Sequence, residues 1–372
     1  MITLFLSLAF TVAAGQQQTS LPSDPTPAQE TVKRQPLSSS EISQLRTKAE
    51  AGDASAQSAL GNAYWTGDGV LHSDETAVTW FRKAADQGDA DGENALGTMY
   101  RMGEGVTKDR DEALLWYHKA ARDGSAAAMF NLGAAYYNGD GVDTDEVTSC
   151  AWFSLAQEAG YPKADDAVRR ATSENAGRPS QAAEKIGEMY LKGGELPKNP
   201  DKALKWYRKA AGGGVPAAAV NAAALLIGGA DPTAEEYGEA RKRCESTAKL
   251  DYGPGAFCMA VIYKRGLGVT QDPNQSAKWL IRAANLGYPK AMLQLGEAYW
   301  KGDGVNPNLI TAYTWIWMAY KAQATGAQQD EEALRKQMDA GDVEKAKKNA
   351  ETSPVRQQLP VPQKKRTDGP TQ

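Results

Sequence analysis

The chain has 372 residues, of which 41% are hydrophobic and 24% charged, and a formal net charge of −4. A chain of this length exceeds one compact core, so it either divides into domains or grows as a stack in which each unit contacts its neighbours. A weakly acidic chain has no basic field to hold a polyanion, so nucleic acid is excluded as an expected partner.

The first 15 residues have the pattern of a secretory signal peptide. They form an uncharged apolar run that ends in small residues such as Ala13 and Gly15, although no Lys or Arg precedes the run. The run is short for a membrane span, and no other segment reaches the roughly 20 apolar residues that a span needs. We therefore expect a periplasmic or secreted protein with no integral membrane segment after signal cleavage; a buried or anchoring helix is the alternative.

Two polar segments flank the rest of the chain. Residues 16–40 are rich in Gln, Pro, Thr and Ser, and residues 352–372 are rich in Pro, Gln and Lys. Neither composition buries enough apolar surface to fold, so a disordered linker and a disordered tail are predicted.

Between these segments, one pattern of aromatic residues recurs six times. A tyrosine is followed sixteen residues later by a tryptophan, with Gly or Ala three residues before the tyrosine and Gly three residues after it. The pairs are Tyr64 and Trp80, Tyr100 and Trp116, Tyr136 and Trp152, Tyr190 and Trp206, Tyr263 and Trp279, and Tyr299 and Trp315. Six coincidences of uncommon residues at one spacing indicate a repeated structural unit, with these aromatic residues in its core.

The first unit shows what the pattern encodes. Leu60, Gly61 and Tyr64 share one face of a predicted helix A, and the missing side chain at Gly61 allows a neighbouring helix to approach closely. Glycines in residues 67–70 end that helix, because glycine adopts positive φ without strain. An apolar stripe from Ala77 to Ala85 then predicts a second helix, helix B.

The intervals between the tyrosines predict seven units. The 73 residues between Tyr190 and Tyr263 hold a degraded fifth unit, in which Ile227 takes the place of the tyrosine. The 54 residues between Tyr136 and Tyr190 are one repeat plus 18 residues. The predicted organisation is a capping helix and units 1–3 over residues 41–163, an inserted helix and turn over 164–181, units 4–7 over 182–326, and C-terminal capping helices over 327–351.

The motif resembles that of a known family. Residues Ala56–Gly88 and Asn94–Gly124 follow the pattern A-x-x-x-L-G-x-x-Y-x-x-G-x-G-V and then D-x-x-x-A-x-x-W-x-x-K-A-A-x-x-G. This pattern resembles the Sel-one-like repeat (SLR), a relative of the tetratricopeptide repeat (TPR), over roughly residues 41–351. The resemblance implies an all-α solenoid, a superhelix of tandem two-helix SLR/TPR-like repeats, that acts in protein–protein contact as an adaptor or scaffold.

Three cysteines are present: Cys150, Cys244 and Cys258. Cys244 lies on helix B of the fifth unit and Cys258 on the following helix A, with the turn near Asp251 between them. Antiparallel helices would place the two thiols at similar height, so an oxidising compartment favours a disulfide; two buried free thiols are the alternative. Cys150 is interpreted as a small core residue.

No motif equips the chain as an enzyme, and no catalytic residue, cofactor or metal site is predicted. Residues Ser246–Lys249 match the S-x-x-K string of penicillin-binding serine enzymes, but the companion S-D-N and K-T-G motifs are missing from the sequence. His72 and His118 have no cysteine or carboxylate at metal-ligand spacing.

The residue directly after each repeated tyrosine is not fixed by the repeat. Because Trp, Tyr and Arg are typical interface anchors, we predict that some of these residues line a partner-binding groove. The candidates are Trp65, Arg101, Tyr137, Lys264 and Trp300. Extra packing between helices is the alternative.

The sequence is therefore interpreted as that of a non-enzymatic scaffold or adaptor of the bacterial envelope with a protein partner. A module that binds cell-wall glycan or peptide through exposed aromatic residues is the alternative. An enzyme that interacts with β-lactams is a third and less favoured interpretation.

Overall fold

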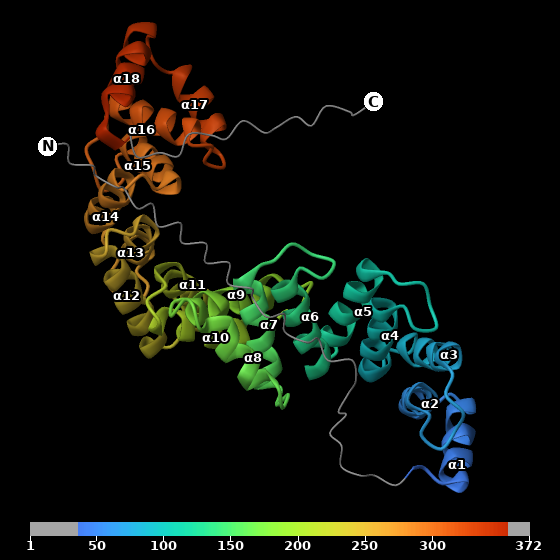
Figure 1. The fold of residues 1–372 in the computed structure, drawn as a ribbon. Helices are drawn as coiled ribbons and strands as arrows, with labels where there is room; N and C mark the ends of the chain where they lie inside the picture. The colour runs from blue at the N-terminus through green and yellow to red at the C-terminus, as the bar shows by residue number, and fades with distance from the viewer. Residues whose placement is uncertain (1–35, 356–372) are drawn as a thin grey trace, which may run out of the picture. The chain divides into compact units, whose positions relative to one another are not determined.

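The computed structural model describes residues 36–355, and this part of the chain contains eighteen helices and no strand (Figure 1). The predicted all-α repeat fold is confirmed. The predicted signal peptide over residues 1–15 lies outside the described residues. Within 36–355, no helix is both long and apolar enough to cross a membrane. The chain divides into two compact units, Met1–Arg178 and Pro179–Gln372, and each is described by itself.

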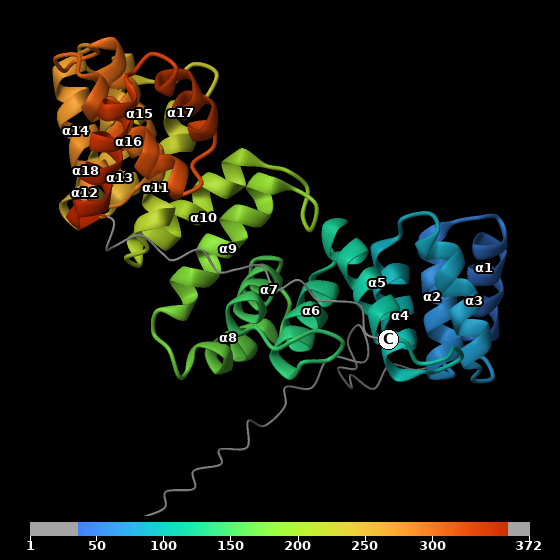
Figure 2. The same ribbon diagram turned by 90° about the horizontal axis from the view of Figure 1, so that it is seen from above.

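The first compact unit contains an initial helix, three helix pairs and an inserted helix. The helices are α1 (Ser39–Glu50), α2 (Ala54–Thr66) with α3 (Asp74–Ala85), α4 (Ala90–Met102) with α5 (Arg110–Arg122), α6 (Ala126–Asn138) with α7 (Glu146–Glu158), and α8 (Ala164–Thr172). Figure 2 shows α1–α5 standing side by side, and in both views α8 lies beside α7.

The second compact unit contains four helix pairs and two closing helices. Its helices are α9 (Arg178–Lys192) with α10 (Pro200–Gly212), α11 (Pro216–Ile227) with α12 (Ala234–Lys249), α13 (Gly253–Arg265) with α14 (Pro273–Asn285), α15 (Pro289–Lys301) with α16 (Leu309–Lys321), α17 (Ala327–Arg335) and α18 (Ala340–Thr352). The degraded fifth repeat thus forms an ordinary helix pair, α11 and α12.

Both ends of the helical region differ slightly from the prediction. The predicted linker extends to residue 40, but α1 begins at Ser39 because Ser38 and Glu41 form a reciprocal capping box that supplies the first free backbone N–H groups with acceptors. The predicted tail begins at residue 352, but Thr352 is the last residue of α18.

In five of the helix pairs, a large side chain of helix B rests on the glycine of helix A. A methyl group at Gly61 would lie 2.7 Å from Phe81 Cδ1, and one at Gly133 would lie 2.5 Å from Phe153 Cδ1. Real side chains do not approach this closely, so only glycine lets the two helices pack at this distance. The ring stands one residue after the repeated tryptophan.

The repeated aromatic residues themselves are less uniformly buried than predicted. Trp152 and Trp206 are buried, but Trp80 and Trp116 are half-buried, as are most of the repeated tyrosines. A lysine three residues later covers the exposed ring face: Lys83 Nζ lies 4.1 Å from the centre of Trp80. The prediction that all these aromatic residues are core residues is therefore corrected, because several are shielded by lysine side chains.

Candidate functional site

Trp65, the first of the predicted groove residues, is a packing residue. Its side chain is 9% exposed, and its ring meets Phe81 edge-on with 6.1 Å between centroids. Its Nε1 donates a hydrogen bond to Glu104 Oε2 at 2.8 Å. Because Glu104 lies in the glycine loop of the next repeat, Trp65 joins two repeats, as the packing alternative expects. A role in binding stays a prediction for this residue.

Two equivalent positions make the same kind of link. Lys264 Nζ lies 3.3 Å from Asp303 Oδ2, and Asp303 follows Lys264 by the same 39 residues that separate Glu104 from Trp65. Trp300 Nε1 donates to Gln337 Oε1 at 3.3 Å. In these three repeats the residue after the tyrosine therefore reaches forward to the next loop or helix, as the packing alternative expects.

The other two candidates stay nearer their own repeat. Arg101 Nε donates to Tyr117 Oη of its own helix B at 3.3 Å. Tyr137 is half-buried, so a role in binding stays a prediction for this residue. Trp65, Arg101 and Tyr137 lie in the first compact unit and Lys264 and Trp300 in the second.

The surface that sequence reasoning missed is a stripe along three of the helices A, α2, α9 and α15; at the equivalent positions of α4, α6, α11 and α13 at least one residue is buried. It consists of the residues nine, five and two positions before the repeated tyrosine and two positions after it, and we call it the helix-A stripe. The stripe comprises Ser55, Ala59, Asn62 and Thr66 on α2, Gln181, Lys185, Glu188 and Lys192 on α9, and Lys290, Gln294, Glu297 and Lys301 on α15. All twelve are exposed or half-buried, and their i, i+4, i+7, i+11 spacing puts them on one face of the helix.

The helix-A stripe differs in charge between helices. On α2 it is uncharged, whereas on α9 and α15 it pairs a glutamate with a lysine four residues later. Lys192 Nζ lies 2.9 Å from Glu188 Oε2, and Lys301 Nζ lies 3.8 Å from Glu297 Oε2. Burial raises the pKa of Glu297, with Lys301 opposing the shift. The repeat does not fix these residues, so their variation could have revealed the surface in the sequence.

The two cysteines of the fifth and sixth repeats are joined by a disulfide. Cys244 on α12 and Cys258 on α13 have Cα atoms 5.7 Å apart. Cys244 takes the position that other repeats give to the large side chain on the glycine, such as Phe81. The bond thus ties the degraded repeat to its successor where that contact is missing. Oxidation in solution stays a prediction, and Cys150 is a buried free cysteine.

The residues of the enzyme-like motifs are engaged in ordinary helix contacts. Ser246 Oγ donates to the carbonyl of Arg243 at 2.8 Å, and Lys249 Nζ lies 2.9 Å from Glu245 Oε1. His72 Nδ1 lies 2.7 Å from the carbonyl oxygen of Trp65. Among residues 36–355, no group of three His, Cys, Asp or Glu side chains is placed to hold a metal ion.

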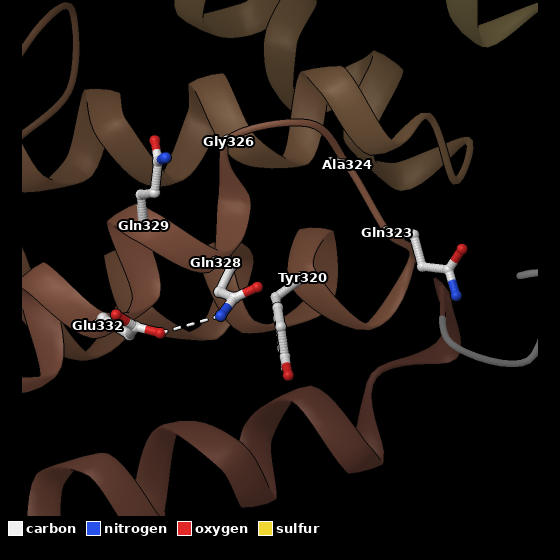
Figure 3. Close-up of a pocket in the computed structure, with 7 residues that line it drawn as sticks. All are labelled: Tyr320, Gln323, Ala324, Gly326, Gln328, Gln329 and Glu332. Carbon is white, nitrogen blue, oxygen red and sulfur yellow. Dashed lines mark hydrogen bonds between the residues drawn. The ribbon is translucent and has the colours of Figure 1, made fainter.

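An open pocket of about 500 Å³ lies at the turn between α16 and α17 (Figure 3). It is lined by Tyr320, Gln323, Ala324, Gly326, Gln328, Gln329 and Glu332. Gln328 Nε2 donates to Glu332 Oε1 at 3.1 Å, and the Tyr320 ring packs 5.5 Å from the ring of Trp317. One aromatic face, three amides and one carboxylate suit hydrogen bonding to a hydroxyl-rich or peptide ligand.

Parts of two curated proteins are similar in sequence to this chain. Chitin synthase regulatory factor 3 of Schizosaccharomyces pombe is 34% identical over 121 residues, which are 30% of this chain and 12% of that protein. Chitin synthase regulator SKT5 of Saccharomyces cerevisiae is 29% identical over 100 residues, which are 27% of this chain and 13% of that protein. The chain thus spans only about an eighth of the length of these relatives.

Two solved structures are also similar. A protective antigen of uropathogenic Escherichia coli that displays an SLR fold is 28% identical, with 89% of this chain and 76% of that chain covered and a TM-score of 0.45. A Sel1 repeat protein from Oxalobacter formigenes is 27% identical, with 87% of this chain and 91% of that chain covered and a TM-score of 0.43.

The family model of the Sel1 repeat matches six segments, residues 54–89, 90–125, 126–161, 180–215, 255–288 and 289–322. The degraded fifth repeat lies between the fourth and fifth of them. Because the six segments make up more than half of the chain, the chain belongs to the Sel1 repeat family, as its motif indicated.

Proposed function

We propose that this protein is a non-enzymatic scaffold that binds a protein partner along its helix-A stripes. Proteins built from Sel1 repeats generally mediate protein–protein interaction. The observation that carries the proposal is that the stripe is open to solvent on α2, α9 and α15 while the repeat leaves its residues free to vary. Three such stripes, on the first, fourth and seventh repeats, offer exposed helix surfaces in place of one deep pocket.

The charges of the stripe indicate the chemistry of the contact in the second compact unit. Lys290 and Lys301 flank Glu297 on α15, so a partner segment there would carry acidic groups opposite the lysines and a donor opposite the glutamate. Such complementary charges steer encounter and exclude wrong partners more than they add affinity.

A setting outside the cytoplasm is the second part of the proposal. The apolar N-terminal run has the pattern of an export signal. The Cys244–Cys258 bond supports the same setting, because structural disulfides persist in oxidising compartments. A bacterial envelope adaptor would meet both conditions.

The experiment is crosslinking in intact cells of the source, fractionated by compartment, with mass spectrometry of the captured proteins. Wild type should capture one dominant protein, and Lys290→Glu should capture it several-fold less. The matched control is Lys278→Glu, which makes the same charge change at an exposed residue of α14. Equal capture by both variants would remove the helix-A stripe from the proposal, and recovery in the cytoplasm would remove the envelope setting.

A second candidate function is binding of cell-wall glycan, and the pocket at the α16–α17 turn favours it. Tyr320 is 36% exposed and lies beside three glutamine amides. An aromatic face stacks on the apolar face of a sugar ring, and amides pair with neighbouring hydroxyl groups. Retention on purified cell-wall sacculi should then fall for Tyr320→Ala and stay unchanged for Leu309→Ala, which removes an exposed side chain from the same helix. Equal retention of both variants would contradict glycan binding at this pocket.

A further inference from the structure

Gln57 and Glu93 occupy the same position of consecutive repeats, 36 residues apart. Gln57 lies on α2, is 5% exposed and uses both ends of its amide. Its Nε2 donates to the carbonyl of Ala49, near the end of α1, at 3.0 Å, and its Oε1 accepts from Gln87 Nε2 at 2.7 Å. The amide therefore ties three segments together: the end of α1, helix α2 and the turn after α3.

Glu93 on α4 occupies the equivalent position but carries a carboxyl group in place of the amide. It is 2% exposed, and its Oε2 is buried without a hydrogen-bond partner. The residues that correspond to Ala49 and Gln87 are Ala85, in the last turn of α3, and Asp123, which follows α5. An ionised Glu93 lacks the donor that Gln57 gives to the carbonyl, and it faces a carboxylate where Gln57 faces an amide.

The charged groups around Glu93 are mostly acidic. From the turn that follows α3 it faces Asp89, and from α5 and the residue after it, it faces Lys119 and Asp123. A protonated carboxyl group has one donor, whereas an ionised one has none. Protonation would therefore supply the donor that Gln57 gives to the carbonyl at the end of the preceding helix, and it would remove the repulsion between Glu93 and Asp123. The contact that Gln57 accepts from Gln87 has no equivalent, because an ionised Asp123 has no hydrogen to donate.

We propose that Glu93 is a proton-operated joint between the first and second repeats: with its proton it ties α4 to α3 as Gln57 ties α2 to α1, and without it the interface loosens. The joint adds a regulated element to the scaffold and does not depend on which partner the scaffold binds. Loosening would move the α2 and α4 faces against each other, so partner contact along the first compact unit would follow pH.

The electrostatics place this change near neutral pH. Burial, and next the carboxylate of Asp123, raise the pKa of Glu93 from 4.5 to about 7, with Lys119 opposing the shift. Because the folded chain has the higher pKa, it binds the proton more tightly than the unfolded chain does. The stabilising contribution of the proton is complete below about pH 4.5 and is lost as the pH rises through 7.

Hydrogen exchange of the full-length protein tests the joint. After correction for intrinsic rates, the α3 and α4 amides should open at least about tenfold more at pH 8 than at pH 5.5, with α13 and α14 as the internal reference. Glu93→Gln should abolish this difference, because it places an amide at the joint. Gln57→Glu should create a similar difference at α1 and α2.

Asp123→Asn provides a test that keeps Glu93. Removal of the neighbouring carboxylate should shift the midpoint of the α3–α4 opening to lower pH, even if the Glu93→Gln variant does not fold. The proposal is overturned if wild type shows no pH-dependent opening at α3 and α4, if Glu93→Gln keeps it, or if Asp123→Asn leaves the midpoint unchanged.

Discussion

The second and third repeats share one motif but differ on the outer side of helix B. In the second repeat, Trp116 is half-buried and Lys119 Nζ lies 4.1 Å from its ring centre. In the third, Trp152 is fully buried and Leu155, which replaces that lysine, is 2% exposed. Helix α8 packs against α7, and Gln157 of α7 donates to Asp165 of α8 at 2.7 Å. An apolar residue three positions after the tryptophan thus marks a repeat whose outer side is covered by a further helix.

The seventh repeat follows the same rule. Its tryptophan, Trp315, is followed three residues later by Met318, which is 3% exposed and shares a core cluster with Ala350 of α18. The two covered repeats are those beside an extra helix, α8 or α18. One side chain of helix B thus records whether a further helix packs on the repeat.

The largest test exchanges that side chain. Leu155→Lys should destabilise the first compact unit by about 4 kcal/mol, because an ammonium group would be buried under α8 without a partner. Lys119→Leu, the reverse change in the open repeat, should alter the free energy of unfolding by less than about 0.5 kcal/mol. Urea unfolding followed by tryptophan fluorescence measures both. Equal losses in the two variants would contradict the rule.

The fifth repeat extends the comparison to a unit that has neither the ring on a glycine nor the tryptophan. Its Cys244 is bonded to Cys258 across 14 residues of chain. Reduction, or a Cys244→Ser and Cys258→Ser double variant, should lower the stability of the second compact unit by about 3 kcal/mol. Hydrogen exchange at α12 and α13 with and without reductant measures the effect, while α2 to α5 should not respond. If the disulfide does not stabilise the fold, reductant will leave the hydrogen exchange of both regions unchanged.

The contact between the glycine of helix A and the ring of helix B should not depend on whether a further helix packs on the repeat. A methyl group at Gly97 would lie 2.9 Å from Tyr117 Cδ1, much as one at Gly133 would lie 2.5 Å from Phe153. Gly97→Ala and Gly133→Ala should each cost about 1–3 kcal/mol in thermal unfolding. Gly238→Ala on α12, which has no atom within 4 Å of the new group, should instead stabilise by about 0.5–1 kcal/mol. If only Gly133→Ala lowers the stability, then the packing of α8 on the third repeat also affects the contact between Gly133 and Phe153.

Much of the fold could be predicted from the sequence, because stacking requires helix pairs of similar length and therefore a regular spacing of the repeats. The interval of 73 residues predicted a hidden fifth repeat, which the structure contains as α11 and α12. The contact inside each helix pair could be predicted only in part. Gly61 indicated that a neighbouring helix approaches closely, but only the structure shows that the ring of Phe81 fills the space. Spacing fixes the helices, whereas a side chain's partner depends on the neighbouring repeat.

The site was less predictable for the same reason. Trp65 was assigned to a groove because tryptophan is a common interface anchor, yet it bonds to Glu104, 39 residues later. Lys264 and Asp303 have the same spacing in the sequence. A single spacing does not predict a contact, because many residue pairs share it and the positions of the loops are not known from the sequence. The burial of Glu93 likewise could not be read from its identity, since glutamate in a helix is usually exposed.

The smallest test concerns the open repeat alone. Lys119→Ala removes the stem and charge that cover Trp116, so it should cost about 0.5–1 kcal/mol and shift the Trp116 emission to longer wavelength. Lys119→Met keeps an apolar stem without the charge and should recover the part of the stability that comes from covering the ring. Because Lys119 also opposes the raised pKa of Glu93, both variants should move the midpoint of the α3–α4 opening to higher pH. If the Trp116 emission shifts but the midpoint of the α3–α4 opening does not, the cover of Trp116 and the protonation of Glu93 are independent. If the midpoint shifts but the emission does not, Lys119 acts chiefly through its charge on Glu93.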